Sequence, residues 1–394
     1  MDNGMGSPWI RRGMYVLMGM LGVTITMVAP MLDGMLREYR LPLSLGGMFT
    51  GAMSVGGLLA IVLLGIFSDR MSKTKIVIWG YFVFAAALVV TCFAPSYSLL
   101  LLCFAVSGVG SKAVDTLSNA VIKDAHTENS GTYLNLMHMF LGNGAIAGPL
   151  ISGGLLNADV SWKAVFAGMG ILCALITFAF TVLMRGQKRA PRPAVRGQAG
   201  SANVPIKGLL ADRRVWIFCL VLFFYTGHQS CINTWISLYF QKQFGYNEGL
   251  SGLALAMYWL GIVVSRLFCS RFYSPKNAKR LLIAGGALGT FVLAGGILID
   301  APAVLLVALL LCGALTGGTI PVVIDLACGF HVVLSGAMTS LLYVCMNVSP
   351  FIFPLMMGSL SDACGMRIGI SIAVLSLALM CIAISLIANR KEEM

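Results

Sequence analysis

The chain has 394 residues, of which 58% are hydrophobic and 11% are charged. A soluble domain carries about 25% charged residues, so this composition and the mean hydropathy of +0.88 exclude an ordinary soluble protein. The formal net charge is +12, but the basic residues stand between apolar segments and not on one folded module. We therefore expect no nucleic-acid partner and attribute the charge to the cytoplasmic loops of a membrane protein.

Apolar runs of helical length follow one another along the chain. The predicted spans are 14–36, 44–67, 74–94, 98–121, 131–156, 163–184, 214–239, 249–272, 279–299, 302–327, 335–360 and 366–388. Each is close to the roughly 20 residues that cross a bilayer. Arg11 and Arg12 precede the first span, as in a secretion signal, but that span is too long for one and another follows at once. The sequence predicts an all-α membrane protein with twelve transmembrane helices, embedded in a lipid bilayer.

Basic residues are concentrated in alternate turns. If the N-terminus is inside, the cytoplasmic turns hold Arg70, Lys73 and Lys75, then Lys123, then the stretch 185–213, then Arg271, Lys276, Lys279 and Arg280, and finally Arg390 and Lys391. The opposite turns are poor in charge, since 95–98 has none and the turn near residue 300 contributes only Asp300. The positive-inside rule predicts a multi-pass protein of the inner (cytoplasmic) membrane with both termini in the cytoplasm.

The stretch 185–213 is basic and rich in Gly, Pro and Ala, which is typical of a flexible linker. It separates six predicted spans in 1–184 from six in 214–394. The segment PLISG (149–153) in the fifth span is echoed by PLMMG (354–358) in the eleventh. Two six-helix halves repeated in parallel resemble the major facilitator superfamily. This resemblance implies the major facilitator fold, with two six-helix bundles.

The eleven cysteines lie singly in or beside the apolar spans, and no C-x-x-C pair occurs. They are interpreted as small packing residues, so we expect no disulfide and no metal site. No Gly-x-x-x-x-Gly-Lys-Ser/Thr phosphate loop occurs either, which argues against a pump driven by ATP. We expect no cofactor and no enzymatic activity.

The turn after the second predicted span reads GIFSDRMSKTK. It resembles the cytoplasmic signature of the major facilitator superfamily, Gly-x-x-x-Asp-Arg-x-x-Arg/Lys, at Gly65, Asp69, Arg70 and Lys73. The resemblance implies a gating role, in which the glycine allows close helix contact and the charges hold the inward side between conformations. The alternative is an ordinary basic loop that obeys the positive-inside rule.

Ionisable residues inside the predicted spans are Asp33, Lys112, Asp115, Arg266 and Asp325. A charge at the centre of an isolated spanning helix costs roughly 2.5–3.5 kcal/mol, so such residues usually face a cavity or a partner. Lys112 and Asp115 are three residues apart and share a helix face. Two interpretations stay open for Asp115: a self-neutralising structural pair, or a carboxylate that takes up and releases a proton. We expect Asp33 and Asp115 to couple transport to a proton.

A narrower resemblance, to the fucose–galactose–hexose sugar:proton symporters, rests on five segments that occur in the same order. They are LDGMLREYRL (32–41), VDTLSN (114–119), LNLMHMFLGNGA (134–145), LGIVVSRLFCSRF (260–272) and MGSLSDACG (357–365). The resemblance places Asp33 and Asp115 at acidic positions of the family. It also implies that Asp33, Asn119, Asn135 and His138 bind the substrate.

The chain departs from that family's pattern at three positions, and these departures leave the substrate open. Leu32 replaces an asparagine, Asp115 replaces a longer glutamate, and Asp325 stands where a neutral residue is usual. Specificity depends on which buried polar groups find partners.

The seventh predicted span mixes polar residues into an apolar run. Gln229, Asn233 and Trp235 stand near one helix face. Amides hydrogen-bond hydroxyl groups and a flat ring covers the C–H face of a sugar, so we expect these residues to bind a polyhydroxylated solute. The alternative is polar contact between helices, worth about 0.6 kcal/mol each. An ordinary histidine titrates near neutral pH, which makes His138 and His228 candidates for a coupling role. The alternative is a neutral core residue, which an isolated histidine in a helix more often is.

Together these features predict a secondary active transporter that moves a small polar solute, with a sugar as the leading candidate, by alternating access coupled to a proton or to sodium. A proton-coupled efflux carrier for lipophilic or cationic compounds is the first alternative, because it uses the same fold and the same carboxylates. A membrane receptor without net transport is the second.

Overall fold

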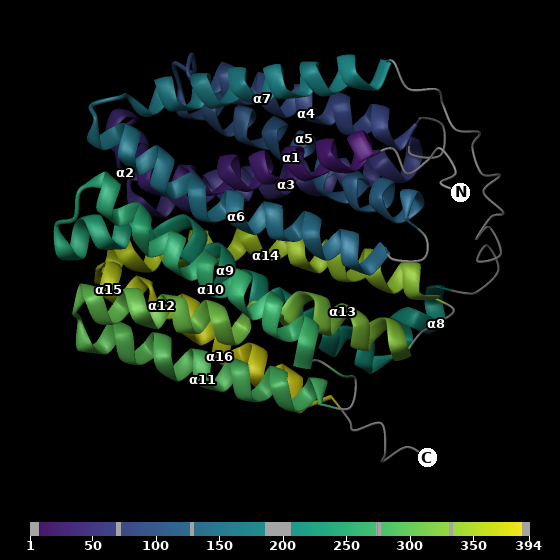
Figure 1. Ribbon diagram of the computed structural model, residues 1–394. Coiled ribbons are helices and arrows are strands. Elements are labelled where there is room, and N and C mark those ends of the chain that lie inside the picture. Colours follow the sequence, from purple (N-terminus) through teal and green to yellow (C-terminus); the bar gives the residue numbers. More distant parts are fainter. Residues whose placement is uncertain are drawn as a thin grey trace. The chain divides into compact units, whose positions relative to one another are not determined.

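The computed structural model describes residues 8–67, 72–126, 130–185, 206–272, 274, 277–330 and 334–387. These residues form sixteen helices and no strand (Figure 1). In order they are α1 (Pro8–Thr26), α2 (Val28–Glu38), α3 (Leu43–Phe67), α4 (Lys73–Thr91), α5 (Tyr97–Ala125), α6 (Ser130–Asn157), α7 (Trp162–Arg185), α8 (Ile206–Ala211), α9 (Arg213–Phe244), α10 (Glu248–Phe272), α11 (Ala278–Ile299), α12 (Pro302–Thr316), α13 (Thr319–Phe330), α14 (Ser335–Cys364), α15 (Met366–Gly369) and α16 (Ser371–Ser385).

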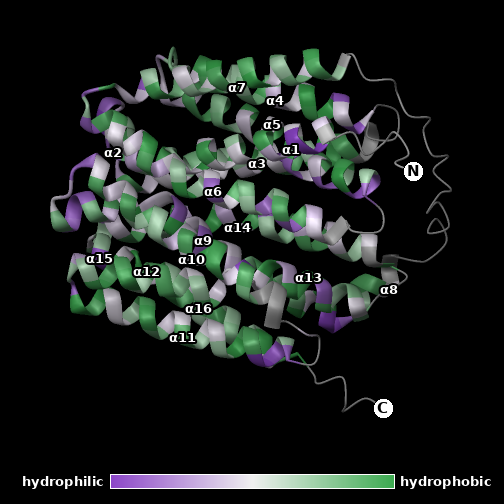
Figure 2. Cartoon of the chain, in the orientation of Figure 1, coloured by the Kyte–Doolittle hydropathy of each residue, from purple (hydrophilic) through white to green (hydrophobic). Residues whose placement is uncertain are grey.

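The helices are long and apolar enough to cross a membrane. Within the described ranges, eleven spans meet that condition, and a twelfth is formed if the bent pair α1 and α2 counts as one. Hydrophobic residues dominate these helices (Figure 2). The predicted all-α membrane fold is therefore confirmed.

The first predicted span is bent by 40° between α1 and α2, because of one proline. Pro30 has no N–H group to donate to the carbonyl of Thr26, so the helical ladder is interrupted there. The Thr26 hydroxyl also donates to the Gly22 carbonyl oxygen at 2.9 Å, and such a bond often accompanies a helix bend. The predicted tenth span is likewise divided into α12 and α13, at the glycine pair 317–318.

The first compact unit contains Met1–Pro191 together with Thr234–Ala256. In this unit α1 packs on α6, α3 on α5, and α4 on both α5 and α7. Small residues let these backbones approach closely. A Cβ atom at Gly144 would lie 1.9 Å from the Gly19 carbonyl oxygen of α1, and one at Gly108 would lie 1.9 Å from the Met53 carbonyl oxygen of α3.

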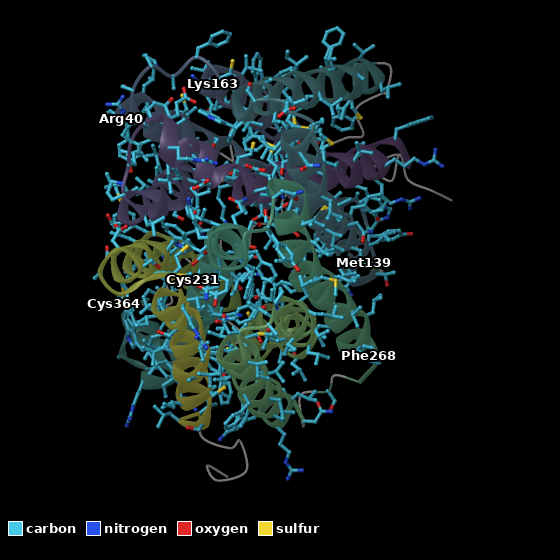
Figure 3. All side chains as sticks on the ribbon, turned by 90° about the vertical axis from the view of Figure 1, so that its left-hand side faces the viewer. Arg40, Met139, Lys163, Cys231, Phe268 and Cys364 are labelled. Carbon is cyan, nitrogen blue, oxygen red and sulfur yellow. The ribbon has the colours of Figure 1, made fainter. Side chains whose placement is uncertain are left out.

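The second compact unit contains Arg192–Asn233 and Met257–Met394. Here α11 packs on α12 and α16, and α14 packs on α13 and α16. The ten cysteines that the structure describes are free, and Cys231 lies fully buried among the helices of this unit (Figure 3). This burial fits the packing role expected of the cysteines.

The packing division differs from the boundaries expected from the linker. Those boundaries, 1–184 and 214–394, place all of α9 and α10 in the second half. By packing, the C-terminal part of α9 and the start of α10 belong with the first unit instead. The two six-helix halves therefore stay a proposal about which segments move together.

Candidate functional site

Polar side chains of α5 and α6 form the first candidate site, which we call the α5–α6 cluster: Lys112, Asp115, Asn119 and His138. Lys112 Nζ lies 3.2 Å from Asp115 Oδ2, as their three-residue spacing predicted. The amide of Asn119 donates to the Asp115 backbone oxygen at 2.6 Å. His138 Nε2 lies 3.0 Å from Asn119 Oδ1. The cluster thus links a carboxylate, an ammonium, an amide and an imidazole inside two spanning helices.

The charges of the α5–α6 cluster are shielded but still reachable. The side chain of Asp115 is 28% exposed and that of Lys112 is 16% exposed. Among the described contacts, the cation beside this carboxylate comes from the same helix. Asn135, which the family resemblance assigns to the substrate, lies one turn before His138 in α6 and is exposed.

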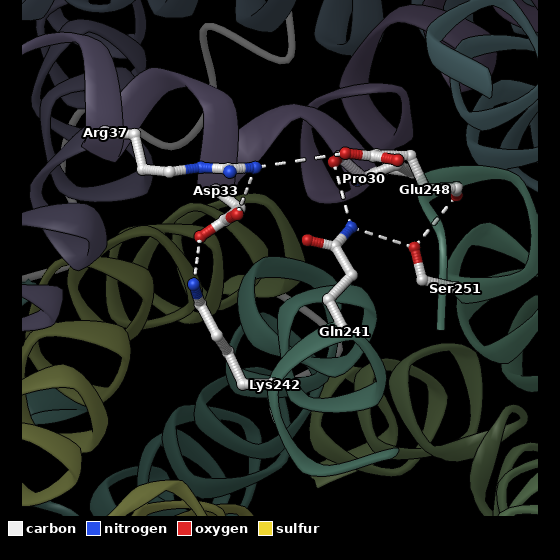
Figure 4. A network of polar contacts seen from close by, with 7 residues as sticks. All are labelled: Pro30, Asp33, Arg37, Gln241, Lys242, Glu248 and Ser251. Atoms are coloured by element: carbon white, nitrogen blue, oxygen red, sulfur yellow. Dashed lines mark hydrogen bonds and ion pairs between the residues drawn. The ribbon is translucent and has the colours of Figure 1, made fainter. Parts of the chain in front are cut away.

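A second group of polar residues, the Asp33 network, joins α2 to α9 and α10 (Figure 4). Its members are Pro30, Asp33, Arg37, Gln241, Lys242, Glu248 and Ser251, all of the first unit. The Asp33 carboxylate lies 2.6 Å from Arg37 Nη2 and 2.7 Å from Lys242 Nζ. Arg37 Nη2 lies 4.0 Å from Glu248 Oε1. Two carboxylates and two cations therefore balance within the network.

Gln241 provides the neutral part of the Asp33 network. Its amide nitrogen donates to the Pro30 carbonyl oxygen at 3.1 Å and to Ser251 Oγ at 2.9 Å. Ser251 Oγ in turn donates to the Glu248 backbone oxygen at 2.9 Å. A carbonyl oxygen has two lone pairs, so Pro30 can accept a bond from a side chain of another helix.

The sequence identified only Asp33 of this network. Arg37 follows Asp33 by four residues, a spacing that predicts an ion pair on one helix face, and this signal was missed. Lys242 and Glu248 lie more than 200 positions away along the chain, and no spacing rule connects them to Asp33. The Asp33 side chain is 10% exposed, and each of its two oxygens pairs with one cation.

The polar residues expected in the seventh span fall in different environments. Trp235 is fully buried, with its ring edge beside Gly46 and Leu36. In this conformation the indole has no exposed surface, and its stacking on a sugar stays a prediction. Asn233 accepts a hydrogen bond from the Trp259 indole at 2.9 Å, and Gln229 is half-buried.

His228 is a core residue. It is fully buried, and Nδ1 lies 3.0 Å from the Ala373 carbonyl oxygen. Nε2 lies 3.7 Å from Cys312 Sγ, and the ring packs edge-on to Tyr258. This environment matches the neutral core alternative considered for His228 and gives it no exposed surface.

Part of the gating signature is described. Gly65 lies in α3, and Lys73 begins α4 with its Nζ 2.7 Å from Asp124 Oδ2 at the end of α5. Asp69 and Arg70 lie outside the described residues. The Lys73–Asp124 pair therefore joins the signature turn to the same helix that carries Asp115.

The remaining intramembrane charges do not join either group in the described contacts. Arg266 is half-buried in α10, and Asp325 is exposed on α13. Within the described ranges no group of three or more His, Cys, Asp or Glu residues is placed to hold a metal ion.

Comparisons with known proteins agree with this architecture. A model of the Major Facilitator Superfamily matches residues 14–354. The uncharacterised MFS-type transporter YfkL of Bacillus subtilis (strain 168) is 21% identical over 357 residues, which cover 90% of this chain and 89% of YfkL. Multidrug resistance protein MdtM of Escherichia coli O157:H7 is 27% identical over 202 residues, 50% of this chain and 46% of that protein.

Solved structures share the fold. A bacterial homolog of the human lysosomal transporter Spinster superposes with a TM-score of 0.79 at 13% identity, over 97% of this chain and 96% of that one. The transporter FucP superposes with a TM-score of 0.66 at 19% identity, over 98% and 100%. Because the family model covers most of the spans described above, the chain belongs to the Major Facilitator Superfamily of membrane transporters.

Proposed function

We propose that this transporter moves a small polar solute by proton-coupled alternating access, with Asp115 as the coupling carboxylate. The observation that carries the proposal is the α5–α6 cluster, in which a partly shielded carboxylate, its cation, an amide and an imidazole are connected within 3.2 Å. Intramembrane ionisable groups of transporters commonly serve as proton relays or substrate partners. A sugar is the leading solute class, because amides and imidazole hydrogen-bond hydroxyl groups.

The proposed coupling follows from charge balance. Deprotonated Asp115 and protonated Lys112 form a neutral pair, and protonation of Asp115 removes the negative charge from that pair. Solute and proton would then bind at neighbouring points of one cluster, so that each changes the affinity for the other. His138 and Asn119 would contact the solute, and Asp115 would carry the proton.

The Asp33 network takes a different part in this proposal. Each oxygen of Asp33 pairs with one cation, Oδ2 with Arg37 and Oδ1 with Lys242, so we assign this carboxylate mainly to the network. The network would form and break as α9 and α10 change position against α2 during the cycle. We place both termini and the 185–213 linker in the cytoplasm of the inner membrane, since the basic turns collect on that side.

A proton-coupled efflux carrier for lipophilic or cationic compounds is the second candidate. It is supported by the similarity to MdtM, whose name describes multidrug resistance. A thermal-unfolding screen of the purified protein against sugars, organic acids and cationic drugs separates the two. A ligand that binds the folded state raises the free energy of unfolding by RT ln(1 + [L]/Kd), and the unfolding temperature rises with it.

The coupling test uses the best ligand of that screen in proteoliposomes. Asp115→Asn keeps the shape of the carboxyl group but cannot titrate. We expect equilibrium exchange to stay within about threefold of wild type and accumulation driven by a pH gradient to fall at least tenfold. The control is Asp159→Asn: Asp159 is exposed after α6 with φ 60°, a conformation that asparagine readily adopts. Gradient-driven accumulation retained by Asp115→Asn would refute the assignment of the proton to this residue.

A further inference from the structure

An apolar groove lies on the surface of the first unit, between α3, α4 and α5. Its volume is about 260 Å³, just below the roughly 300–1,000 Å³ of small-molecule sites. All ten lining residues are aliphatic, glycine or tryptophan. Trp79, Leu63 and Val83 at its edge are exposed, and the Trp79 side chain is 63% exposed. The groove therefore opens outward and not into the polar clusters described above.

Small residues at a helix crossing produce this groove. Gly80 of α4 and Gly110 of α5 approach so closely that a Cβ atom at Gly110 would lie 2.5 Å from the Gly80 carbonyl oxygen. Ala60 and Ala113 are buried beside them and line the same space. Because none of these residues has a long side chain, the crossing leaves a hollow that the larger side chains around it do not fill.

The position of the groove along the helices is that of one membrane leaflet. Its α4 residues run from Ile76 to Val83, and α4 begins at Lys73. At a rise of about 1.5 Å per residue, Val83 lies about 15 Å from the start of α4, which is half of the roughly 30 Å hydrocarbon core. An apolar hollow that opens sideways at this depth contacts hydrocarbon chains.

A basic residue stands at the water-facing end of the groove. Lys75 is exposed and precedes Trp79 by four residues, so the two share one face of α4. Lys73 is already paired with Asp124, whereas Lys75 forms no ion pair with any residue that the structure describes. Tryptophan is typical of the membrane interface, and a lysine beside it attracts anionic head groups.

We propose that this groove binds one acyl chain of an anionic phospholipid, with Lys75 at the phosphate-bearing head group and Trp79 along the upper part of the chain. A zwitterionic lipid has the same hydrocarbon and no net charge, so Lys75 supplies the preference between the two. The site is separate from the α5–α6 cluster and does not depend on which solute is transported.

The experiment titrates the purified full-length chain in detergent with dioleoyl-phosphatidylglycerol or dioleoyl-phosphatidylcholine, and measures bound lipid by native mass spectrometry. One basic residue near the surface is worth about 1 kcal/mol, or about fivefold in affinity. We expect that preference for phosphatidylglycerol in wild type and its loss in Lys75→Gln. Arg280→Gln is the matched control, because Arg280 is an exposed basic residue in the first turn of α11, and it should keep the preference.

Lipids whose acyl chains carry bromine atoms report on the groove itself, because bromine quenches the fluorescence of nearby indoles. The part of the quenching that depends on Trp79 is the difference between wild type and Trp79→Phe. We expect Val109→Phe, which puts a larger side chain into the groove, to remove that part, and Val83→Phe at the exposed edge serves if Val109→Phe does not fold. Unchanged Trp79-dependent quenching in the filled variant overturns the groove, and a preference for phosphatidylglycerol that survives Lys75→Gln overturns the anionic head group.

Discussion

The two intramembrane carboxylates of the first unit, Asp33 and Asp115, are held in different ways. Asp115 pairs with one cation three residues away on its own helix and keeps 28% of its side chain exposed. Asp33 is 10% exposed and pairs with two cations, one from α2 and one from α9. A pair within one helix persists when helices move, whereas a pair between helices must break. The arrangement of Asp115 is compatible with the coupling role proposed for it. The arrangement of Asp33 suits a group that stabilises one conformation.

The largest effect that would sharpen this contrast is expected at Asn119. Asn119→Leu removes both the donor to the Asp115 carbonyl and the acceptor for His138. If the α5–α6 cluster binds the solute, the affinity of this variant for the solute should fall at least tenfold. The measurement is the ligand-induced rise in unfolding temperature. Asn347→Leu is the matched control, since Asn347 donates to the Tyr343 carbonyl four residues back in α14. Equal losses in both variants would show that the effect is structural.

The next effect concerns the Asp33 network. A double-mutant cycle of Asp33→Asn and Lys242→Gln should give a coupling of about 1 kcal/mol in unfolding free energy, a modest value because 47% of the Lys242 side chain is exposed. The coupling should fall in 1 M salt, where the Debye length is about 3 Å. The same cycle for Asp115→Asn and Lys112→Gln should depend less on salt, since the Lys112 side chain is only 16% exposed, against 47% for Lys242. A salt-independent Asp33–Lys242 coupling would remove the contrast.

A smaller effect is expected at Lys112. Asp115→Asn removes the carboxylate 3.2 Å from this shielded ammonium group, and the loss of an opposite charge in a low-dielectric span is destabilising. Lys112→Met in the same background should raise the folded yield about twofold by size-exclusion chromatography. An unchanged yield would mean that Lys112 reaches water without help from Asp115.

The smallest effect is expected at the Lys73–Asp124 pair. The two side chains are 40% and 53% exposed, and exposed pairs contribute roughly 0–1 kcal/mol. Lys73→Gln should therefore leave the unfolding temperature nearly unchanged while lowering the transport rate, if the gating signature acts on conformational change. A large loss of stability would place this pair among the structural contacts instead.

Much of the fold could be predicted, because spanning helices are encoded locally by runs of apolar residues of fixed length. The pairing of Lys112 with Asp115 was predictable for the same reason, since one helix fixes both. The bend after Thr26 was also encoded, by Pro30, but hydropathy does not register it. The partners of Asp33 were not predictable, because Lys242 reaches it only through the packing of helices far apart in the chain. The burial of Trp235 was not predictable either, because composition cannot tell a buried indole from an exposed one.

The bend at Pro30 separates α1, whose packing on α6 tolerates little change, from α2, whose residues can vary. α1 is held against α6 by a backbone contact at Gly144, where a Cβ atom would lie 1.9 Å from the Gly19 carbonyl oxygen. Beyond the bend, the 11 residues of α2 carry Asp33 and Arg37. Mutations in α2 can therefore change the strength of the network without disturbing the α1–α6 contact, so that evolution can adjust the two halves of one membrane span independently.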